Sequence, residues 1–383
     1  MHVVVAIDSF KGSLSSMEAA SAVAEGVLAA APHARLTLCP LADGGEGTLD
    51  ALLSATNGIR ETLTVQGPLG TPVDACYGYL PETRTAVIEM AQAAGLTLLG
   101  EQERDPMRTT TFGVGELIRH AIEAHSCRRF LVGLGGSATN DGGVGMLTAL
   151  GYAFLDADST PIPPGAKGLE VLARIDPLGA HPALRDCNFI LACDVTNPLC
   201  GERGCSAVFA PQKGATPEQI PLMDAWLADY AKQTHALLGV NRSNQAGAGA
   251  AGGLGFAFLS YLHAEMRAGI DVVIEATRLE EHVRTADLVI TGEGRLDGQT
   301  GMGKAPVGIA RVAKAHGKPV LALAGSLTPD ASACNRLGID AFFPILPTPC
   351  SLSDAMEPSN AAANLKRTAE QALRLMACPL PNS

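Results

Sequence analysis

The chain has 383 residues, of which 47% are hydrophobic and 17% charged, and this length and composition predict two domains with ample core. Its net charge of −11, with only one Trp and five Tyr, argues against nucleic-acid binding, which needs basic surfaces and aromatic stacking platforms. No apolar run is long enough to span a membrane, and the N-terminus lacks the pattern of a secretory signal. The ten scattered cysteines are interpreted as free thiols of a cytoplasmic protein.

The first sixty residues alternate strands and helices. The predicted elements are a strand over 3–7, a helix over 16–31, a strand over 36–40 and a helix ending near residue 56. A polar turn containing Asp and Gly follows each strand, at 8–13 and at 42–48. This pattern predicts a parallel, helix-flanked sheet that binds ligands at the carboxyl ends of its strands.

The pattern changes after residue 60. Short strand-like runs separated by Gly-Pro and Leu-Pro-Glu turns, over 62–65, 73–79 and 85–90, predict a β-rich insertion. The Pro- and Gly-rich segment 158–184 is interpreted as a surface excursion. Further predicted elements are a helix to about residue 125, strands over 130–132 and 189–193, a helix over 216–238, and a helix from the glycine-rich segment 247–255 to about residue 266.

Residues 133–143, Gly-Leu-Gly-Gly-Ser-Ala-Thr-Asn-Asp-Gly-Gly, join the strand 130–132 to a helix predicted over 144–150. Five glycines remove side chains, so that backbone N–H groups can approach a ligand closely. A bare polar turn at a helix N-terminus is typical of anion sites. An ordinary strand-to-helix connection that uses glycine for tight packing is the alternative.

The alternation returns late in the chain, with a strand over 287–291, a helix over 304–316, strands over 319–323 and 341–346, and a closing helix. The sequence therefore predicts an α/β fold in which a parallel-sheet domain, 1–65 and 285–383, is interrupted by an inserted mixed α/β domain, 66–284. The active site is expected in the cleft between them.

Turns that contain acidic residues or groups able to bind phosphate recur after the predicted strands. They contain Asp8 and Lys11; Asp43 and Glu46; Ser137, Asn140 and Asp141; Asp194 and Asn197; and Glu293, Arg295 and Asp297. One such turn could be an ordinary helix cap, but five on one sheet edge, with Lys304 nearby, suit a magnesium-nucleotide reaction. Residues 298–305 nearly match a phosphate-binding P-loop, but Ala305 replaces the hydroxyl that would hold the metal, which argues against that interpretation.

The chain resembles the bacterial glycerate kinase family of the two-domain type along almost its full length. The matching strings, in the family's order, are 8–15, 41–48, 133–143, 192–199, 247–255 and 288–297. One departure is Ile7, where relatives usually carry Pro. The resemblance implies ATP-dependent phosphorylation of D-glycerate, with ATP and Mg2+ as cofactors, in the cytoplasm. It also implies a Rossmann-like domain interrupted by a second one.

That chemistry assigns roles to residues of the turns, each of them a hypothesis from residue type and strand-end position. Asp194, then Asp43, is expected to position or deprotonate the acceptor hydroxyl, with Lys11 and Arg295 as further catalytic cations. Lys11 or Arg295, helped by Ser9 and Arg108, would bind the glycerate carboxylate. Magnesium candidates are Asp297, Glu293 and Asp141. Nucleotide-binding candidates are Gly135, Gly136, Ser137, Thr139, Asn140, Gly252, Gly253 and Lys304.

The sequence leaves several alternatives open. The 2-phosphoglycerate product is favoured over 3-phosphoglycerate, but the chain does not decide it. The substrate could instead be another small hydroxy or sugar acid, or the chain could be a non-catalytic binder of such acids. A dinucleotide oxidoreductase fails because no G-x-G-x-x-G follows the first strand. No nucleic-acid or membrane partner is expected, and the oligomeric state, a homodimer included, is open.

Overall fold

A computed structural model describes residues 1–42, 44–45, 47–298 and 305–378. The chain divides into two compact units. Unit 1 consists of Met1–Asp43, Asp50–Thr56 and Ile270–Ser383, and unit 2 of Gly44–Leu49 and Asn57–Gly269. Both units are therefore discontinuous in sequence.

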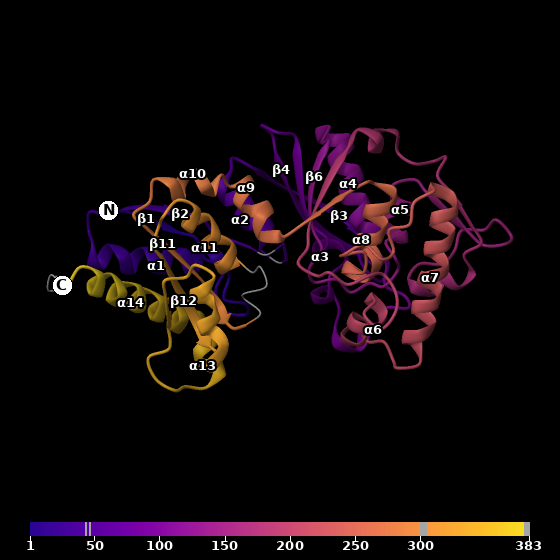
Figure 1. The fold of residues 1–383 in the computed structure, drawn as a ribbon. Helices are drawn as coiled ribbons and strands as arrows, with labels where there is room; N and C mark the ends of the chain where they lie inside the picture. The colour runs from indigo at the N-terminus through magenta and orange to yellow at the C-terminus, as the bar shows by residue number, and fades with distance from the viewer. Residues whose placement is uncertain (43, 46, 299–304, 379–383) are drawn as a thin grey trace. The chain divides into compact units, whose positions relative to one another are not determined.

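Unit 1 is built on a five-stranded sheet in which every pair of neighbouring strands is parallel (Figure 1). The strand order is β13-β12-β11-β1-β2. The strands are β1 (His2–Val5), β2 (Arg35–Leu38), β11 (Leu288–Leu296), β12 (Val320–Leu327) and β13 (Ala341–Pro344). Every residue of β1 is buried, as expected for a central parallel strand covered on both faces. This is the Rossmann-like architecture that the sequence predicts.

Helices follow the strands of unit 1. They are α1 (Ser16–Ala30), α2 (Thr48–Ala55), α9 (Gly269–Ala276), α10 (Leu279–Arg284), α11 (Ala305–Ala315), η7 (Pro329–Ser332), α12 (Ala333–Arg336), α13 (Leu352–Met356) and α14 (Pro358–Met376). The first helix begins with a capping box, in which the Ser15 hydroxyl accepts from the Glu18 amide and the Glu18 carboxylate accepts from the Ser15 amide. Two donors that would otherwise be unpaired are satisfied in this way.

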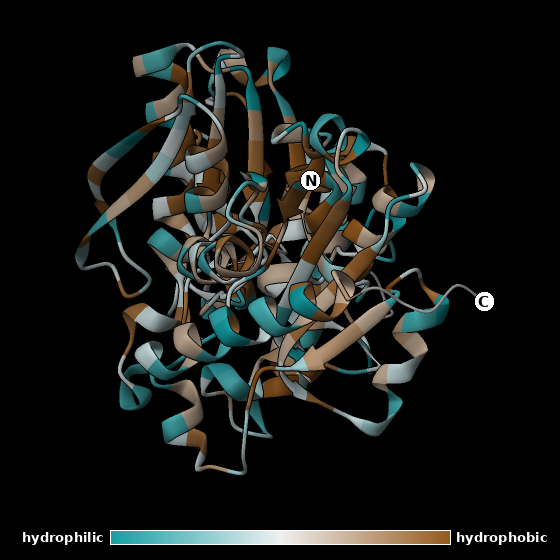
Figure 2. Ribbon diagram, turned by 90° about the vertical axis from the view of Figure 1, so that its left-hand side faces the viewer, coloured by the Kyte–Doolittle hydropathy of each residue, from teal (hydrophilic) through white to brown (hydrophobic). Residues whose placement is uncertain are grey.

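Helices α1 and α14 lie side by side in unit 1 (Figure 1). Gly26 allows their close approach, because a Cβ at this position would lie 2.1 Å from the Lys366 carbonyl oxygen. Apolar residues of both helices join those of β1 and β11 in one buried cluster. Figure 2 shows the corresponding hydrophobic colour along much of the buried strands.

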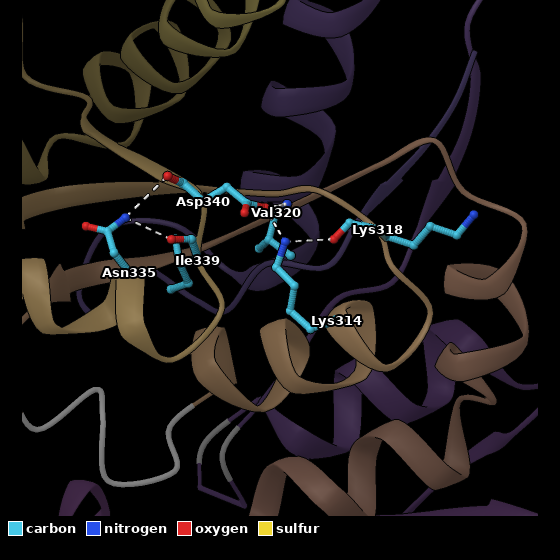
Figure 3. Close-up of polar contacts among 6 residues, drawn as sticks. All are labelled: Lys314, Lys318, Val320, Asn335, Ile339 and Asp340. Carbon is cyan, nitrogen blue, oxygen red and sulfur yellow. Dashed lines mark hydrogen bonds and ion pairs between the residues drawn. The ribbon is translucent and has the colours of Figure 1, made fainter.

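Asp340 ties the beginning of β13 to that of β12 (Figure 3). Its carboxylate accepts from the Val320 amide at 2.7 Å and pairs with the Lys314 ammonium. Asn335 donates to the carbonyl oxygens of Ile339 and Asp340 at 2.8 and 3.3 Å. This network fixes the turn that leads into the edge strand.

Unit 2 contains a mixed six-stranded sheet of order β10-β9-β6-β5-β4-β3. The four strands from β10 to β5 are parallel, and β4 and β3 run antiparallel to their neighbours. The strands are β3 (Ile59–Gln66), β4 (Pro72–Leu80), β5 (Thr85–Glu89), β6 (Arg129–Gly133), β9 (Asn188–Ala192) and β10 (Glu265–Arg267), with a separate pair, β7 (Ala153–Leu155) and β8 (Arg174–Asp176). The predicted mixed α/β insertion in an α/β fold is confirmed.

The core of unit 2 is centred on the parallel strands, where the rings of Phe130 and Phe189 stack 4.7 Å apart. Its helices are α3 (Ala91–Ala94), η1 (Leu96–Leu98), η2 (Glu101–Glu103), α4 (Phe112–His125), α5 (Val144–Ala149), η3 (Ala166–Val171), η4 (Pro182–Asp186), α6 (Cys205–Phe209), η5 (Pro211–Lys213), α7 (Gln219–Leu238) and α8 (Ala250–Tyr261).

The unit boundaries lie at residues 57 and 269, whereas the sequence placed them at 65 and 285. Strand β3 belongs to unit 2 because its whole length pairs with β4. Helix α10 packs on α11, and Gly308 of α11 lies against Ile270, where a Cβ would be 2.7 Å from that side chain. These contacts place 270–284 in unit 1.

Three predicted elements differ from the structure. The helix expected to reach residue 266 ends at Tyr261, because His263 takes a positive φ of 50° and the chain then forms β10. The segment 158–184 contains η3, β8 and part of η4. Strand β11 runs on to Leu296, where its pairing with β12 continues, so that Glu293 and Arg295 lie on a strand and not in a turn.

Candidate functional site

Four parallel strands of unit 2 end in one row. In the register of the sheet, Glu89 of β5 lies beside Gly133, Gly133 beside Ala192, and Ala192 beside Arg267 of β10. The loops that leave these four residues therefore start side by side. Open α/β sheets bind their ligands at this carboxyl edge, so this row locates the candidate site of unit 2.

Two glycines after β2 pack onto this row. Gly44, at φ +85°, lies against Ala192, where a Cβ would be 2.7 Å from the alanine methyl. A Cβ on Gly133 would lie 2.4 Å from the Gly44 carbonyl oxygen, and one on Gly135 2.8 Å from the Gly45 Cα. Only glycine permits such contacts on both sides. The segments 44–45 and 133–135 are thus held in direct backbone contact.

The glycine-rich loop has an exposed part and a buried part. Gly135 and Gly136 are exposed, whereas the polar side chains that follow, Ser137, Thr139 and Asn140, are at most 9% exposed. The Asn140 amide donates to the Ser206 hydroxyl at 2.9 Å. Within this loop, the two glycines therefore expose their backbone, and the three polar side chains are buried inside unit 2.

Lys213, which sequence reasoning missed, lies under this loop. It is 2% exposed, and its ammonium donates to the Ser137 hydroxyl at 2.8 Å and to the Thr139 carbonyl oxygen at 2.7 Å. Burial lowers its pKa to about 8, although Cys205 and Asp141 favour the protonated form. Nothing in its local sequence, Pro-Gln-Lys-Gly, distinguishes it from a solvated lysine.

Asp141 is also buried, at 1% exposure. Its carboxylate accepts from the amide and the hydroxyl of Thr111, both at 2.8 Å, and from the amides of Gly143 and Gly145 at 3.0 and 3.2 Å. Burial raises its pKa against the effect of these hydrogen bonds. Because four donors surround its two oxygens, the geometry fits a residue that joins the starts of α4 and α5 better than the predicted magnesium ligand.

Gly252 and Gly253, at the start of α8, also pack on the glycine-rich loop. Both take positive φ, at 66° and 89°, and a Cβ on Gly252 would lie 2.0 Å from the Thr139 carbonyl oxygen. The Gly252 carbonyl accepts from the Gly142 amide at 3.0 Å. Both glycines are buried, so the structure gives them a close-packing role and no exposed backbone for a nucleotide.

Asp194 follows β9 at the carboxyl edge and is exposed. One oxygen of its carboxylate accepts from the amide of Gly269, where α9 begins, at 3.0 Å. The exposed Asp194 and the exposed Gly135–Gly136 backbone thus follow adjacent strands, β9 and β6. Arg108 is exposed on the loop before α4, in the same unit.

Glu89 and Arg267 end the outer strands of the same row and were also missed. Glu89 is buried, and its carboxylate accepts from the Leu49 amide at 2.8 Å and the Gln92 side chain at 3.3 Å. The sequence does not indicate that these two residues lie at the edge of the sheet. Glu89 stands within a predicted strand and Arg267 at the end of a predicted helix, and only the sheet register shows their position.

Unit 1 gathers the other predicted residues at the carboxyl edge of its own sheet. The Asp8 amide donates to the Gly292 carbonyl at 3.0 Å, and the Asp8 carboxylate accepts from the Ser9 amide at 2.7 Å. The backbone at Lys11 lies against Gly294, whose Cβ would be 3.7 Å from the Lys11 nitrogen. Lys11 is exposed. The turn after β1 and the end of β11 are therefore neighbours.

Charged side chains also lie at the end of β11. Arg295 and Asp297 form an ion pair at 3.8 Å. Burial raises the pKa of Cys334, and the negative charges of Glu293, Asp297 and Asp330 raise it further. No group of three or more His, Cys, Asp or Glu side chains arranged to hold a metal is found among the described residues. Asp43 and Lys304 lie outside the described residues.

The electrostatic pattern of unit 1 differs from that of unit 2. In unit 1, Lys11 and Arg295 are exposed, Arg295 pairs with Asp297, and Glu293 is buried. In unit 2, the exposed groups are the backbone of Gly135 and Gly136 and the side chain of Asp194. Carboxylate oxygens are the ligands that Mg2+ prefers, and cations balance negative charge on a phosphoryl group. Both edges carry groups that suit an anionic substrate.

No helix within residues 1–42, 44–45, 47–298 and 305–378 has the length and hydropathy needed to cross a membrane. All ten cysteines are free thiols.

Comparison with known proteins identifies the family. Residues 3–377 match the glycerate kinase family. The chain is 48% identical to a glycerate kinase of Bacillus subtilis, with 96% of each chain covered, and 46% identical to a glycerate 2-kinase of Escherichia coli, with 93% of each covered. A crystal structure described as that of a glycerate kinase 2 from Salmonella typhimurium LT2 superposes with a TM-score of 0.89 at 47% identity, covering 98% of both chains. The chain therefore belongs to the glycerate kinase family and is a kinase.

Proposed function

We propose that this protein transfers the γ-phosphoryl group of ATP to a hydroxyl of D-glycerate and forms 2-phosphoglycerate. The observation that carries the proposal is the pairing of an exposed carboxylate, Asp194, with the bare backbone of Gly135–Gly136 at the ends of adjacent parallel strands. Family membership supports the kinase activity, and the name of the Escherichia coli relative, glycerate 2-kinase, supports the position of the phosphate.

In the proposed reaction, Asp194 orients the acceptor hydroxyl and takes its proton as the hydroxyl oxygen bonds to the γ-phosphorus. The bond from that phosphorus to the bridging oxygen breaks, and ADP leaves. The Gly269 amide donates to one oxygen of Asp194, and this hydrogen bond restricts the rotation of the carboxylate. A positioned base of this kind is worth about 10²–10⁴ in rate.

The N–H groups of Gly135 and Gly136 are proposed to bind ATP phosphate oxygens. Their exposure, and the close backbone contact of the loop with Gly44–Gly45, support this assignment, because bare glycine backbone suits phosphate binding at a helix-preceding loop. Ser137, Thr139 and Asn140 are proposed to support the loop and not to contact the nucleotide.

Lys11 and Arg295 are proposed to bind the glycerate carboxylate, with Ser9 and Arg108 as helpers. Single variants test these assignments: neutralising Lys11 or Arg295 should raise the KM for glycerate, while changes at Gly135 should raise the KM for ATP. An unchanged KM for glycerate in the Lys11 and Arg295 variants would contradict their assignment.

Glu293 and Asp297 fit a divalent cation in their donor chemistry, since both are carboxylates on the unit 1 edge and hard oxygen donors suit Mg2+. We propose that they hold Mg2+, which would neutralise charge on the ATP phosphates when bound. Asp141 is left out of this assignment because its oxygens are occupied by four protein donors. The roles of Asp43 and Lys304 stay predictions.

A coupled ATPase assay over a panel of small hydroxy and sugar acids tests the substrate. We expect ADP release with D-glycerate and much slower release with the other acids. Faster ADP release with a different acid would show that the protein is a kinase for that acid. Binding of glycerate without ADP release would indicate a non-catalytic binder. The ten free thiols support a proposed location in the reducing cytoplasm.

A further inference from the structure

A buried ammonium group lies directly under the glycine-rich loop. Lys213 is almost completely excluded from solvent, and its two partners, the Ser137 hydroxyl and the Thr139 carbonyl oxygen, belong to the same three-residue segment. Burial of a charge is costly unless the charge is paired or hydrogen-bonded. An aliphatic side chain would fill this space without that cost, so packing alone does not explain a lysine here.

The opposite side of the loop is attached to the segment that follows β5. The Gly136 carbonyl accepts from the Leu96 amide at 2.8 Å, and the Ala138 amide donates to the Ala94 carbonyl at 2.9 Å. The loop is thus held between α3–η1 on one side and η5, which carries Lys213, on the other. The two exposed glycines come immediately before the segment that Lys213 holds.

Two polar side-chain atoms on the buried side of the loop are already unpaired in the described part of the chain. Neither Thr139 Oγ1 nor Asn140 Oδ1 has a hydrogen-bond partner among the described residues, and both atoms are buried. Removal of the ammonium would leave the Ser137 hydroxyl and the Thr139 carbonyl in the same situation. Because unpaired buried polar groups reduce the stability of the folded state, the loop would have to rearrange. The rearrangement would reach Gly135 and Gly136.

We propose that Lys213 is the positioning residue of the donor-binding loop: its ammonium fixes residues 137–139 so that the Gly135 and Gly136 amides are held ready for the phosphates of ATP. This inference rests on the proposed assignment of the loop to ATP. Lys213 does not contact the nucleotide in this account. Its charge also adds to the positive potential under the loop, which favours an anionic ligand.

The test uses the full-length protein with Lys213→Met, which keeps the length of the side chain and removes the charge. Lys232→Met is the matched control, because Lys232 is 76% exposed and pairs only with Asp229 on α7 of the same unit. We measure kcat, the KM values for ATP and D-glycerate, and the calorimetric affinity for ATP without a second substrate. Lys213→Met should weaken ATP binding by about tenfold or more, the value of a hydrogen bond to a charged group, while the KM for glycerate stays within a factor of two or so.

Two further variants keep the inference testable if Lys213→Met does not fold. Ser137→Ala removes one acceptor and should weaken ATP binding in the same direction, and Lys213→Arg, which retains the charge, should recover part of the affinity. Unchanged ATP affinity in folded Lys213→Met, or an effect confined to glycerate, would overturn the inference. Failure of the proposed function is seen separately, because a wild-type protein that binds ATP but does not phosphorylate glycerate leaves the calorimetric comparison intact.

Discussion

The carboxylate of Asp194 accepts a hydrogen bond from the amide of Gly269 at 3.0 Å, although 75 residues separate the two in the chain. Gly269 follows β10, which pairs with β9 directly before Asp194. The pairing of these two strands therefore fixes the direction of the carboxylate at the sheet edge. An exposed aspartate on a loop would otherwise be free to change rotamer, so this contact is what makes Asp194 suitable as a positioned base.

Replacing Asp194 by Asn should lower kcat by about 10²–10⁴, because the amide cannot take the hydroxyl proton, while ATP affinity stays near that of the wild type. Steady-state kinetics and calorimetry measure the two quantities. Asp186→Asn is the control, since Asp186 is exposed at the amino end of the same strand. A near-normal kcat in Asp194→Asn would show that another residue supplies the base.

Asp141→Asn should reduce the free energy of unfolding by about 1–3 kcal/mol, because an amide cannot accept from all of the donors that surround the carboxylate. Urea denaturation measures the loss, which we expect to be equal with and without Mg2+. Asp158→Asn, on an exposed turn of the same unit, is the control. A variant of normal stability whose activity needs much more Mg2+ would instead support the metal role predicted from the sequence.

The pH dependence of ATP binding should report Lys213. Burial lowers the pKa of this ammonium to about 8, against an ordinary value of about 10.4, so the KM for ATP should rise as the pH passes about 8. The change should be absent in Lys213→Met. Since the folded pKa is the lower one, the buried charge costs stability below about pH 8, and this cost should diminish as the pH rises toward about 10. Parallel pH profiles for the two proteins would contradict the assignment.

Asp340→Asn tests the network of Figure 3 in unit 1. Burial alone would raise the pKa of Asp340, but the hydrogen bonds from Lys314 and the Val320 amide outweigh it and lower the pKa. The stabilisation is therefore present above about pH 4 and is lost as the pH falls through the lowered folded pKa. We expect a loss of about 0.5–1 kcal/mol at neutral pH, measured by urea denaturation at several pH values. An unchanged acid-unfolding profile would show that the network contributes nothing.

The sequence predicts the fold of this chain because hydrophobic runs and polar, glycine-containing turns alternate with the right spacing. Val3 to Val5 and Phe189 to Ala192 are strands as expected, and the turns after them do lie at carboxyl edges. The extension of β11 is different. Gly292-Glu293-Gly294-Arg295 reads locally as a turn, and only its pairing with β12 shows that it continues the strand.

The chemistry of the site is less accessible from the sequence, since it depends on which side chains become buried. Lys213 lies 74 residues from Thr139 in the chain, and no local sequence pattern predicts their contact. Asp141 has the residue type and position of a metal ligand, but the amide and hydroxyl of Thr111 donate to its Oδ2 and the Gly143 amide donates to its Oδ1. Packing between distant segments decides both cases, and composition or periodicity carries no information on it.

The position of the new phosphate is the most direct test of the proposed activity. The purified protein is incubated with D-glycerate, ATP and Mg2+, and the product is examined by phosphorus NMR against authentic 2- and 3-phosphoglycerate. We expect the resonance of 2-phosphoglycerate for the wild type and its loss in Asp194→Asn. Accumulation of 3-phosphoglycerate, or no phosphorylated glycerate at all, would contradict this expectation.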